Sequence, residues 1–193
     1  MRIIISLLAC SLFLYSCSNA GNSSAKPSGN DTLTQQRFFP VTEYLKGEIF
    51  TIKNTGINPL KYTTVNGLTD SVWLKHEQLD SAFSEFLQPE IDSVNLIKYF
   101  TESNFMDQSL NAVTFTYDPS GTLPENMKLK HWDIYIEPKT GKVKRVYMVK
   151  QPAKNKTLQL TWISGQSCKI TTIAIDERGE MKAEKEEKII WDF

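Results

Sequence analysis

Histidine is scarce in this chain of 193 residues, and its scarcity limits the chemistry that we expect. There are two histidines, His76 and His131, and they lie far apart in the sequence. Protein zinc sites usually combine histidine and cysteine at short, characteristic spacings. Neither histidine has such a neighbour, so we expect no metal site and no bound cofactor.

The sequence also lacks the short motifs through which many enzymes bind phosphate or activate a nucleophile. It has no glycine-rich phosphate loop, no Gly-x-Ser-x-Gly and no His-Glu-x-x-His. Cys168 would need a nearby base to react, and we expect it to be a small buried strand residue instead. Asp133 and Glu137 would be roughly 13 Å apart along one strand, too far for a glycosidase pair. We therefore expect no catalytic residues.

An excess of positive charge is absent as well. Lys and Arg together number 22, as do Asp and Glu, which gives a formal net charge of zero. A nucleic-acid-binding protein needs a basic face that displaces counterions from phosphates. The balance of charges argues against nucleic acid as a partner.

The first residues of the chain predict an export signal. Met1-Arg2 is a short positive start, and residues 3–15 form an apolar run that is too short for an ordinary membrane span. The run ends at Leu14-Tyr15-Ser16-Cys17, which resembles the lipobox of bacterial lipoproteins. The resemblance implies that residues 1–16 are a cleaved signal peptide and that Cys17 carries a diacylglycerol thioether and an acylated amine. The alternative is a plain secretory signal with an incidental cysteine.

The lipobox resemblance also implies a location. Several acyl chains hold a protein firmly on a bilayer, so the membrane becomes a partner through the lipid anchor. Ser18-Asn19 follows Cys17, and no Asp indicates retention in the inner membrane. We therefore expect the protein in the bacterial cell envelope, on the outer membrane and facing the periplasm. With Cys10 in the signal and Cys17 lipidated, Cys168 has no partner for an intrachain disulfide.

The remaining chain divides into a linker and a domain. Residues 17–36 are rich in Asn, Ser and Gly and have almost no apolar side chains, which predicts a flexible tether. The chain as a whole is 40% hydrophobic, enough for one core of ordinary size. We expect residues 37–193 to form that single domain.

The first part of this domain has helical patterns around one hairpin. Residues 41–52 place apolar side chains at helical spacing, and residues 79–87 do the same before Pro89. A shorter helix is expected after Asp92, which can cap it. Between the helices, Asn66-Gly67 predicts the tight turn of a hairpin.

From about residue 111 the apolar period changes to two, which predicts antiparallel strands. The clearest hairpin covers residues 129–150, where Glu137-Pro138-Lys139-Thr140-Gly141 provides a turn with a bulge. We expect an α+β fold, in which N-terminal helices pack on one face of a mainly antiparallel meander sheet of five or six strands. The other face would be wet.

The solvent-exposed face of the hairpin is the candidate interaction site. On the first strand, His131 and the next alternate residues should point to solvent, beside Lys144 and its neighbours on the second strand. The residues predicted to form the interaction face are Asp133, Tyr135, Glu137, Arg145 and Tyr147. Aromatic and charged groups together are typical of interfaces. Cross-strand ion pairs on a solvated sheet would give the same pattern without a partner.

Residues 132–143 are also similar to the strand-turn-strand of PepSY-type and related inhibitor-like domains, which are helix-plus-sheet modules of the bacterial envelope. The resemblance covers about twelve residues. It implies protein binding or protease inhibition.

These observations predict a non-catalytic envelope lipoprotein whose tethered domain binds an envelope protein or a glycan. A second possibility is an inhibitor or propeptide-like regulator of an exported enzyme. A third is a carrier of a small apolar ligand, which requires a cavity lined by residues such as Phe83, Phe115 and Trp162.

Overall fold

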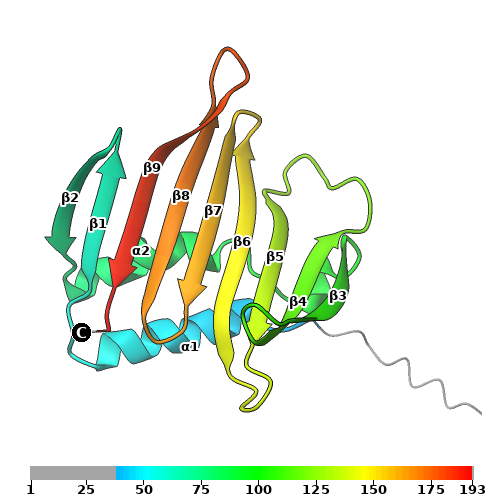
Figure 1. The fold of residues 1–193 in the computed structure, drawn as a ribbon, viewed down its shortest axis with the longest axis horizontal. Coiled ribbons are helices and arrows are strands. Elements are labelled where there is room, and N and C mark those ends of the chain that lie inside the picture. Colours follow the sequence, from blue (N-terminus) through cyan, green and yellow to red (C-terminus); the bar gives the residue numbers. More distant parts are fainter. Residues whose placement is uncertain (1–37, 193) are drawn as a thin grey trace, which may run out of the picture. The chain divides into compact units, whose positions relative to one another are not determined.

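The computed structural model describes residues 38–192, which form one nine-stranded antiparallel sheet with short helices against one face (Figure 1). The predicted signal peptide, Cys17 and the tether lie outside these residues. Three α-helices and one 3-10 turn are present in the described part of the chain: α1 (Val41–Asn54), η1 (His76–Gln78), α2 (Leu79–Leu87) and α3 (Ser93–Leu96). The strands are β1 (Leu60–Val65), β2 (Leu68–Trp73), β3 (Phe100–Asp107), β4 (Ala112–Pro119), β5 (Leu129–Ile136), β6 (Val143–Ala153), β7 (Lys156–Ile163), β8 (Ser167–Ile175) and β9 (Met181–Ile190).

The strand order is β2-β1-β9-β8-β7-β6-β5-β4-β3. From β3 to β9 each strand pairs with the next one in the sequence, as a meander does. The β1–β2 hairpin then closes on the last strand, because β1 pairs with β9 from Leu60↔Ile190 to Val65↔Lys185. The two ends of the domain's sequence therefore meet inside the sheet, and β2 and β3 are its two edges.

The predicted α+β fold with a sheet of five or six strands is wrong. Of the described residues, 48% are in strands and 19% in helices, so the domain is mostly one large sheet with three short helices. The prediction kept the β1–β2 hairpin apart from the meander, because no local pattern reveals its pairing with β9. It also omitted β3, whose side chains are mostly exposed and do not alternate between apolar and polar.

Several local features are confirmed. Asn66 and Gly67 have φ of 52° and 81°, as a tight two-residue hairpin turn requires. Asp92 caps α3 by accepting a hydrogen bond of 2.8 Å from the Asn95 backbone N–H. The turn between β5 and β6 contains Gly141 at φ 69°, and the strand pairing shifts between Tyr135 and Ile136. Local turn and capping chemistry was therefore readable in the sequence.

The helices pack on one face of the sheet and form the core with it. The amphipathic helices α1 and α2 lie behind the sheet in the view of Figure 1. Phe83 of α2 contacts Trp162 of β7 edge to face, with ring centroids 5.3 Å apart, and Trp191 packs beside both. Farther along the sheet, Tyr117 stacks on Trp132 at 4.6 Å. None of the helices within residues 38–192 is long and apolar enough to cross a membrane.

Polar contacts fix both helices to this face. Lys150 of β6 donates to the main-chain carbonyls of Glu85 and Gln88 at the end of α2, and also to the Glu85 carboxylate at 3.1 Å. Burial lowers the pKa of Lys150, which the charge and hydrogen bond of Glu85 partly counteract. On α1, the Glu48 carboxylate accepts the Gly165 backbone N–H at 2.9 Å. We call this side of the sheet the helix face.

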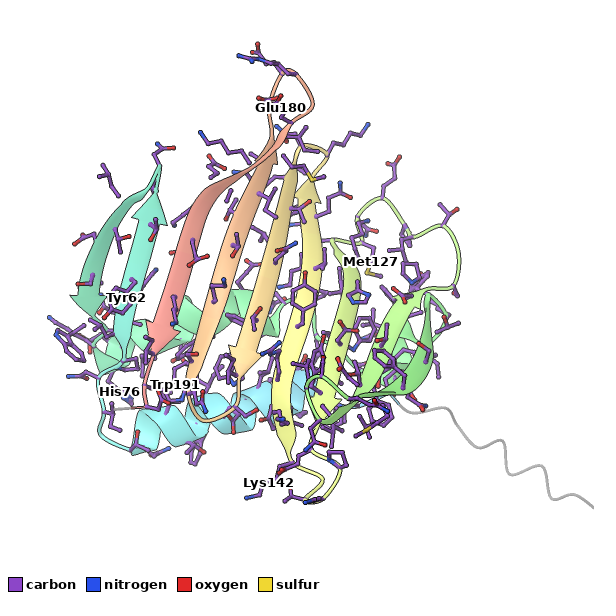
Figure 2. All side chains as sticks on the ribbon, viewed as in Figure 1. Tyr62, His76, Met127, Lys142, Glu180 and Trp191 are labelled. Atoms are coloured by element: carbon purple, nitrogen blue, oxygen red, sulfur yellow. The ribbon has the colours of Figure 1, made fainter. Side chains whose placement is uncertain are left out.

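The opposite side, the open face, has no helix over it among the described residues (Figure 1). Figure 2 shows the side chains of the domain, with Lys142 at the lower turn and Glu180 at the tip of the β8–β9 hairpin. Because neighbouring strands share their alternation, open-face side chains align in rows across the sheet. The candidate site lies on this face.

Candidate functional site on the open face

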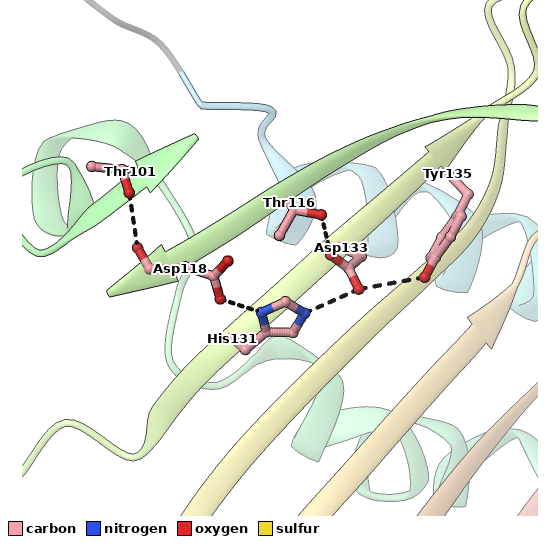
Figure 3. A network of polar contacts seen from close by, with 6 residues as sticks. All are labelled: Thr101, Thr116, Asp118, His131, Asp133 and Tyr135. Atoms are coloured by element: carbon pink, nitrogen blue, oxygen red, sulfur yellow. Dashed lines mark hydrogen bonds and ion pairs between the residues drawn. The ribbon is translucent and has the colours of Figure 1, made fainter. Parts of the chain in front are cut away.

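The open face has a polar cluster where β4, β5 and β6 lie side by side (Figure 3). Alternation along β5 turns Trp132 and Ile134 to the core, and Asp133 to the open face. Directly opposite Asp133 are Thr116 on β4 and Tyr147 on β6. We define the open-face cluster as Thr116, Asp118, His131, Asp133, Tyr135, Arg145 and Tyr147.

His131 lies between two carboxylates. Its Nδ1 is 2.8 Å from Asp118 Oδ1, and its Nε2 is 3.0 Å from Asp133 Oδ2. The hydrogen bond to Asp133 contributes most to raising the pKa of His131 to about 9, and the bond to Asp118 adds to it, although burial acts in the opposite direction. At neutral pH the ring is therefore an imidazolium that donates from both nitrogens.

Asp133 is the best-connected member of the cluster. It is 8% exposed, and besides His131 it accepts the Thr116 hydroxyl at 2.7 Å and the Tyr135 hydroxyl at 3.4 Å. Burial acts to raise the pKa of Asp133, but the hydrogen bonds from His131 and Thr116 and the imidazolium charge outweigh it and hold the pKa below its ordinary value. The carboxylate thus stays ionised, and with His131 and Asp118 it gives the cluster's centre one negative charge.

Two tyrosines and an arginine surround this centre. The Tyr147 ring contacts His131 at a centroid distance of 6.2 Å, and the Arg145 guanidinium lies 5.6 Å from the centroid of the Tyr135 ring. Burial and the charge of Asp133 raise the pKa of both tyrosines, so their hydroxyls remain protonated. These side chains offer hydrogen-bond donors, flat rings and a cation at one surface.

Of the residues predicted for the interaction face, Asp133, Tyr135, Arg145 and Tyr147 come together, whereas Glu137 lies apart. Strand β5 ends at Ile136, and Glu137 belongs to the turn, where its N–H donates to the Lys142 carbonyl at 2.8 Å. The Glu137 carboxylate accepts the Thr140 hydroxyl at 2.7 Å. The change of register before Ile136 ends the alternation on which its placement was based.

The sequence analysis did not identify Thr116 and Asp118. Both residues belong to β4, which extends to Pro119. The signal was present, because the apolar series Val113, Phe115 and Tyr117 implies that the residues between them face the other way.

The chain has no match in the comparisons with protein-family models, curated proteins and solved structures. The lipobox resemblance of residues 14–17 and the hairpin resemblance of residues 132–143 therefore stay predictions. The function must be argued from the geometry of the site.

The bonding of His131 does not suit a general base. Both His131 nitrogens donate to carboxylates, so neither offers a lone pair to accept a proton from a substrate. Cys168 is buried on the helix side of β8, and burial raises its pKa well above the ordinary value, which disfavours the reactive thiolate. Within residues 38–192, no three His, Cys, Asp or Glu side chains are grouped so that they could hold a metal ion.

Proposed function

We propose that this protein is a non-catalytic binding protein of the bacterial cell envelope, which recognises an envelope protein or a glycan with the open face of its sheet. The observation that carries the proposal is the open-face cluster. Its charged, aromatic and hydroxyl side chains are held in fixed positions on a face that no described helix covers.

The rigidity of the cluster supports a binding role. Thr116, Asp118 and Asp133 come from two adjacent strands and together fix the plane of the His131 ring. A ligand that contacts this ring or Tyr147 meets groups whose orientation is already set. Pre-organised groups lose little conformational entropy on binding, which favours affinity.

The envelope location rests on the sequence alone. The lipobox at Leu14-Tyr15-Ser16-Cys17 and the polar residues that follow it favour a lipid-anchored domain on a tether. Replacing Cys17 with Ala should move the protein from the membrane fraction to the soluble fraction. Unchanged membrane association would contradict the anchor.

The apolar-carrier alternative required a cavity lined by residues such as Phe83 and Trp162, and these two do not line one. Phe83 and Trp162 are fully buried and in edge-to-face contact, so the space between these two rings is filled. The inhibitor or propeptide-like alternative uses the same open face and differs in the partner, which would be one exported enzyme.

Site-specific photo-crosslinking in intact cells tests the proposal. A benzophenone amino acid in place of Tyr147 puts the probe on the open face, and the same amino acid in place of Phe50, which is 69% exposed on α1, provides the control on the other side. We expect a reproducible adduct from position 147 and none from position 50. Mass spectrometry then distinguishes protein from glycan. Absence of an adduct at position 147, or equal adducts at both positions, would overturn the proposal.

A further inference from the structure

A second feature of the open face begins at the edge of the cluster and extends from β4 to β9. Two cavities occur there, of about 250 Å³ and about 120 Å³, and Ile163 of β7 lines both. The larger is lined by Thr161, Ile163, Ser167, Cys168, Lys169, Glu186 and Lys188. The smaller is lined by Leu110, Ala112, Tyr135, Lys144, Arg145 and Ile163. We call the two together the cationic trough.

The trough is positively charged although the chain has no net charge. Its lining includes four cations, Lys144, Arg145, Lys169 and Lys188, and one carboxylate, Glu186. The positive charge is therefore concentrated on one part of one face, which is how a protein of balanced composition attracts an anion locally.

Two of these cations are directly opposite each other. Lys169 on β8 pairs with Lys188 on β9, and like charges at directly opposed positions destabilise a sheet. Glu186 relieves one of them, with 3.2 Å between its carboxylate and Lys169 Nζ. Lys188 Nζ has no hydrogen-bond or ion-pair partner among the described residues. An anionic group placed between the two ammonium groups would remove the repulsion.

The neighbouring strands continue this pair into a polar row. From β6 to β1, successive pairings align Tyr147, Thr161, Lys169, Lys188 and Tyr62. Four strand spacings of roughly 4.8 Å make this row about 19 Å long. It thus has a tyrosine at each end and a hydroxyl and two ammonium groups between them, and Tyr62 is labelled in Figure 2.

We propose that the cationic trough binds an acidic polysaccharide, with a carboxylate or sulfate of the chain between Lys169 and Lys188. This assignment rests on the proposed function and selects the glycan among its possible ligands. Both cavities are smaller than the roughly 300–1,000 Å³ of compact small-molecule sites, and they follow one another across the sheet, as a linear chain requires. Hydroxyl groups and tyrosine rings suit sugar hydroxyls and ring faces. Protein partners usually insert large side chains into deep apolar pockets, and these two cavities are small.

Calorimetric titration of the lipidated, full-length protein in detergent tests the assignment. The probes are a short oligogalacturonate, which is carboxylated, and a heparin oligosaccharide, which is sulfated. A dextran oligosaccharide provides the neutral sugar, and poly-L-glutamate provides carboxylates without sugar. We expect binding of at least one acidic oligosaccharide that weakens with added salt, and weak or no binding of dextran and poly-L-glutamate.

Three variants locate the site. Lys169→Gln and Lys188→Gln should each weaken the acidic oligosaccharide roughly tenfold, as expected for loss of one charged hydrogen bond. Lys182→Gln changes the net charge equally, but Lys182 is exposed on β9 outside the trough, so it should have no effect. Lys188→Gln removes only the repulsion and should not lower the urea midpoint, whereas Lys169→Gln also loses the exposed ion pair with Glu186 and should change it little.

The assignment is wrong if neither acidic oligosaccharide binds, if poly-L-glutamate binds as tightly, or if all three variants behave alike. Its failure can be distinguished from failure of the proposed function. A protein adduct from position 147 without glycan binding would leave the open face as a protein-binding surface. If position 147 gives no adduct and no acidic oligosaccharide binds, both proposals are wrong.

Discussion

The two faces of the sheet use charged side chains in different ways. On the helix face, Lys150 is 2% exposed and its ammonium group bonds the end of α2, so its charge is used inside the molecule. On the open face, 26% of the His131 side chain is exposed although both nitrogens are bonded. One face therefore fixes the fold, and the other keeps fixed charges within reach of a ligand. Substitutions on each face should separate these two roles.

The largest loss of stability should come from the core. Replacing Trp162 with Ala removes a fully buried ring that contacts Phe83 and Phe86 at 5.3 Å, and it should lower the free energy of unfolding by about 3–5 kcal/mol. Urea denaturation measures the loss. Phe50→Ala on the solvent side of α1 is the matched control and should change stability by less than about 0.5 kcal/mol. Similar values for both would contradict the role of the core beneath the helix face in stability.

The next largest effect concerns the buried charge. Lys150→Ala leaves the carbonyls of Glu85 and Gln88 without their donor and should lower the free energy of unfolding by about 2–4 kcal/mol. Lys150→Met keeps most of the packing and should lose less. Lys154→Ala, at an exposed turn, should be within about 0.5 kcal/mol of wild type in the same urea titration. If Lys150→Ala matched that control, Lys150 would not hold α2.

A smaller, pH-dependent effect should come from His131. Its pKa rises from 6.5 in the unfolded chain to about 9 in the fold, so its contribution is complete below pH 6.5 and is lost as the pH rises through 9. Because the ring is partly exposed, solvent reduces the effect to about 1–2 kcal/mol. Urea titrations at one pH below 6.5 and one pH above 9 should show this decrease in stability in the wild type. In His131→Gln the decrease should be smaller by that amount, and an unchanged pH dependence would refute the ion pairs.

The smallest effect on stability should accompany a clear effect on binding. Arg145 contributes a cation–π contact and no ion pair among the described residues, so Arg145→Glu should change the free energy of unfolding by less than about 1 kcal/mol. It should nevertheless reduce the adduct formed from position 147, because it reverses a charge on the open face. If the adduct yield from position 147 were the same with Arg145 and with Glu at position 145, the partner would bind elsewhere.

Local chemistry in the sequence predicted much of the secondary structure. The Asn66-Gly67 turn, the Asp92 cap and the two hairpin strands around Gly141 follow from φ preferences and capping, which act over a few residues. The alternation along β5 and β6 was enough to bring Asp133, Tyr135, Arg145 and Tyr147 to one surface.

Long-range and edge features could not be predicted in the same way. The pairing of Leu60 with Ile190 joins distant segments, and nothing near either residue encodes it. Strand β3 faces solvent over most of its length, so selection for burial leaves no alternating pattern there. Glu137 was misplaced relative to the cluster because a register shift beside Ile136 interrupts the strand. The size of the sheet and the limits of the site depend on these features.

The edge strand β2 affects the tendency of the molecules to associate through their sheets. All six of its residues are exposed, and Asp70 is the single charge among them. Proteins commonly use lysine, proline or a bulge to keep such a border from adding further strands. Here one carboxylate serves that purpose, and without it residues 68–73 would be an uncharged, β-prone hexapeptide of the kind that seeds fibrils. Asp70 is therefore the one charged side chain within β2 that opposes strand addition along this edge.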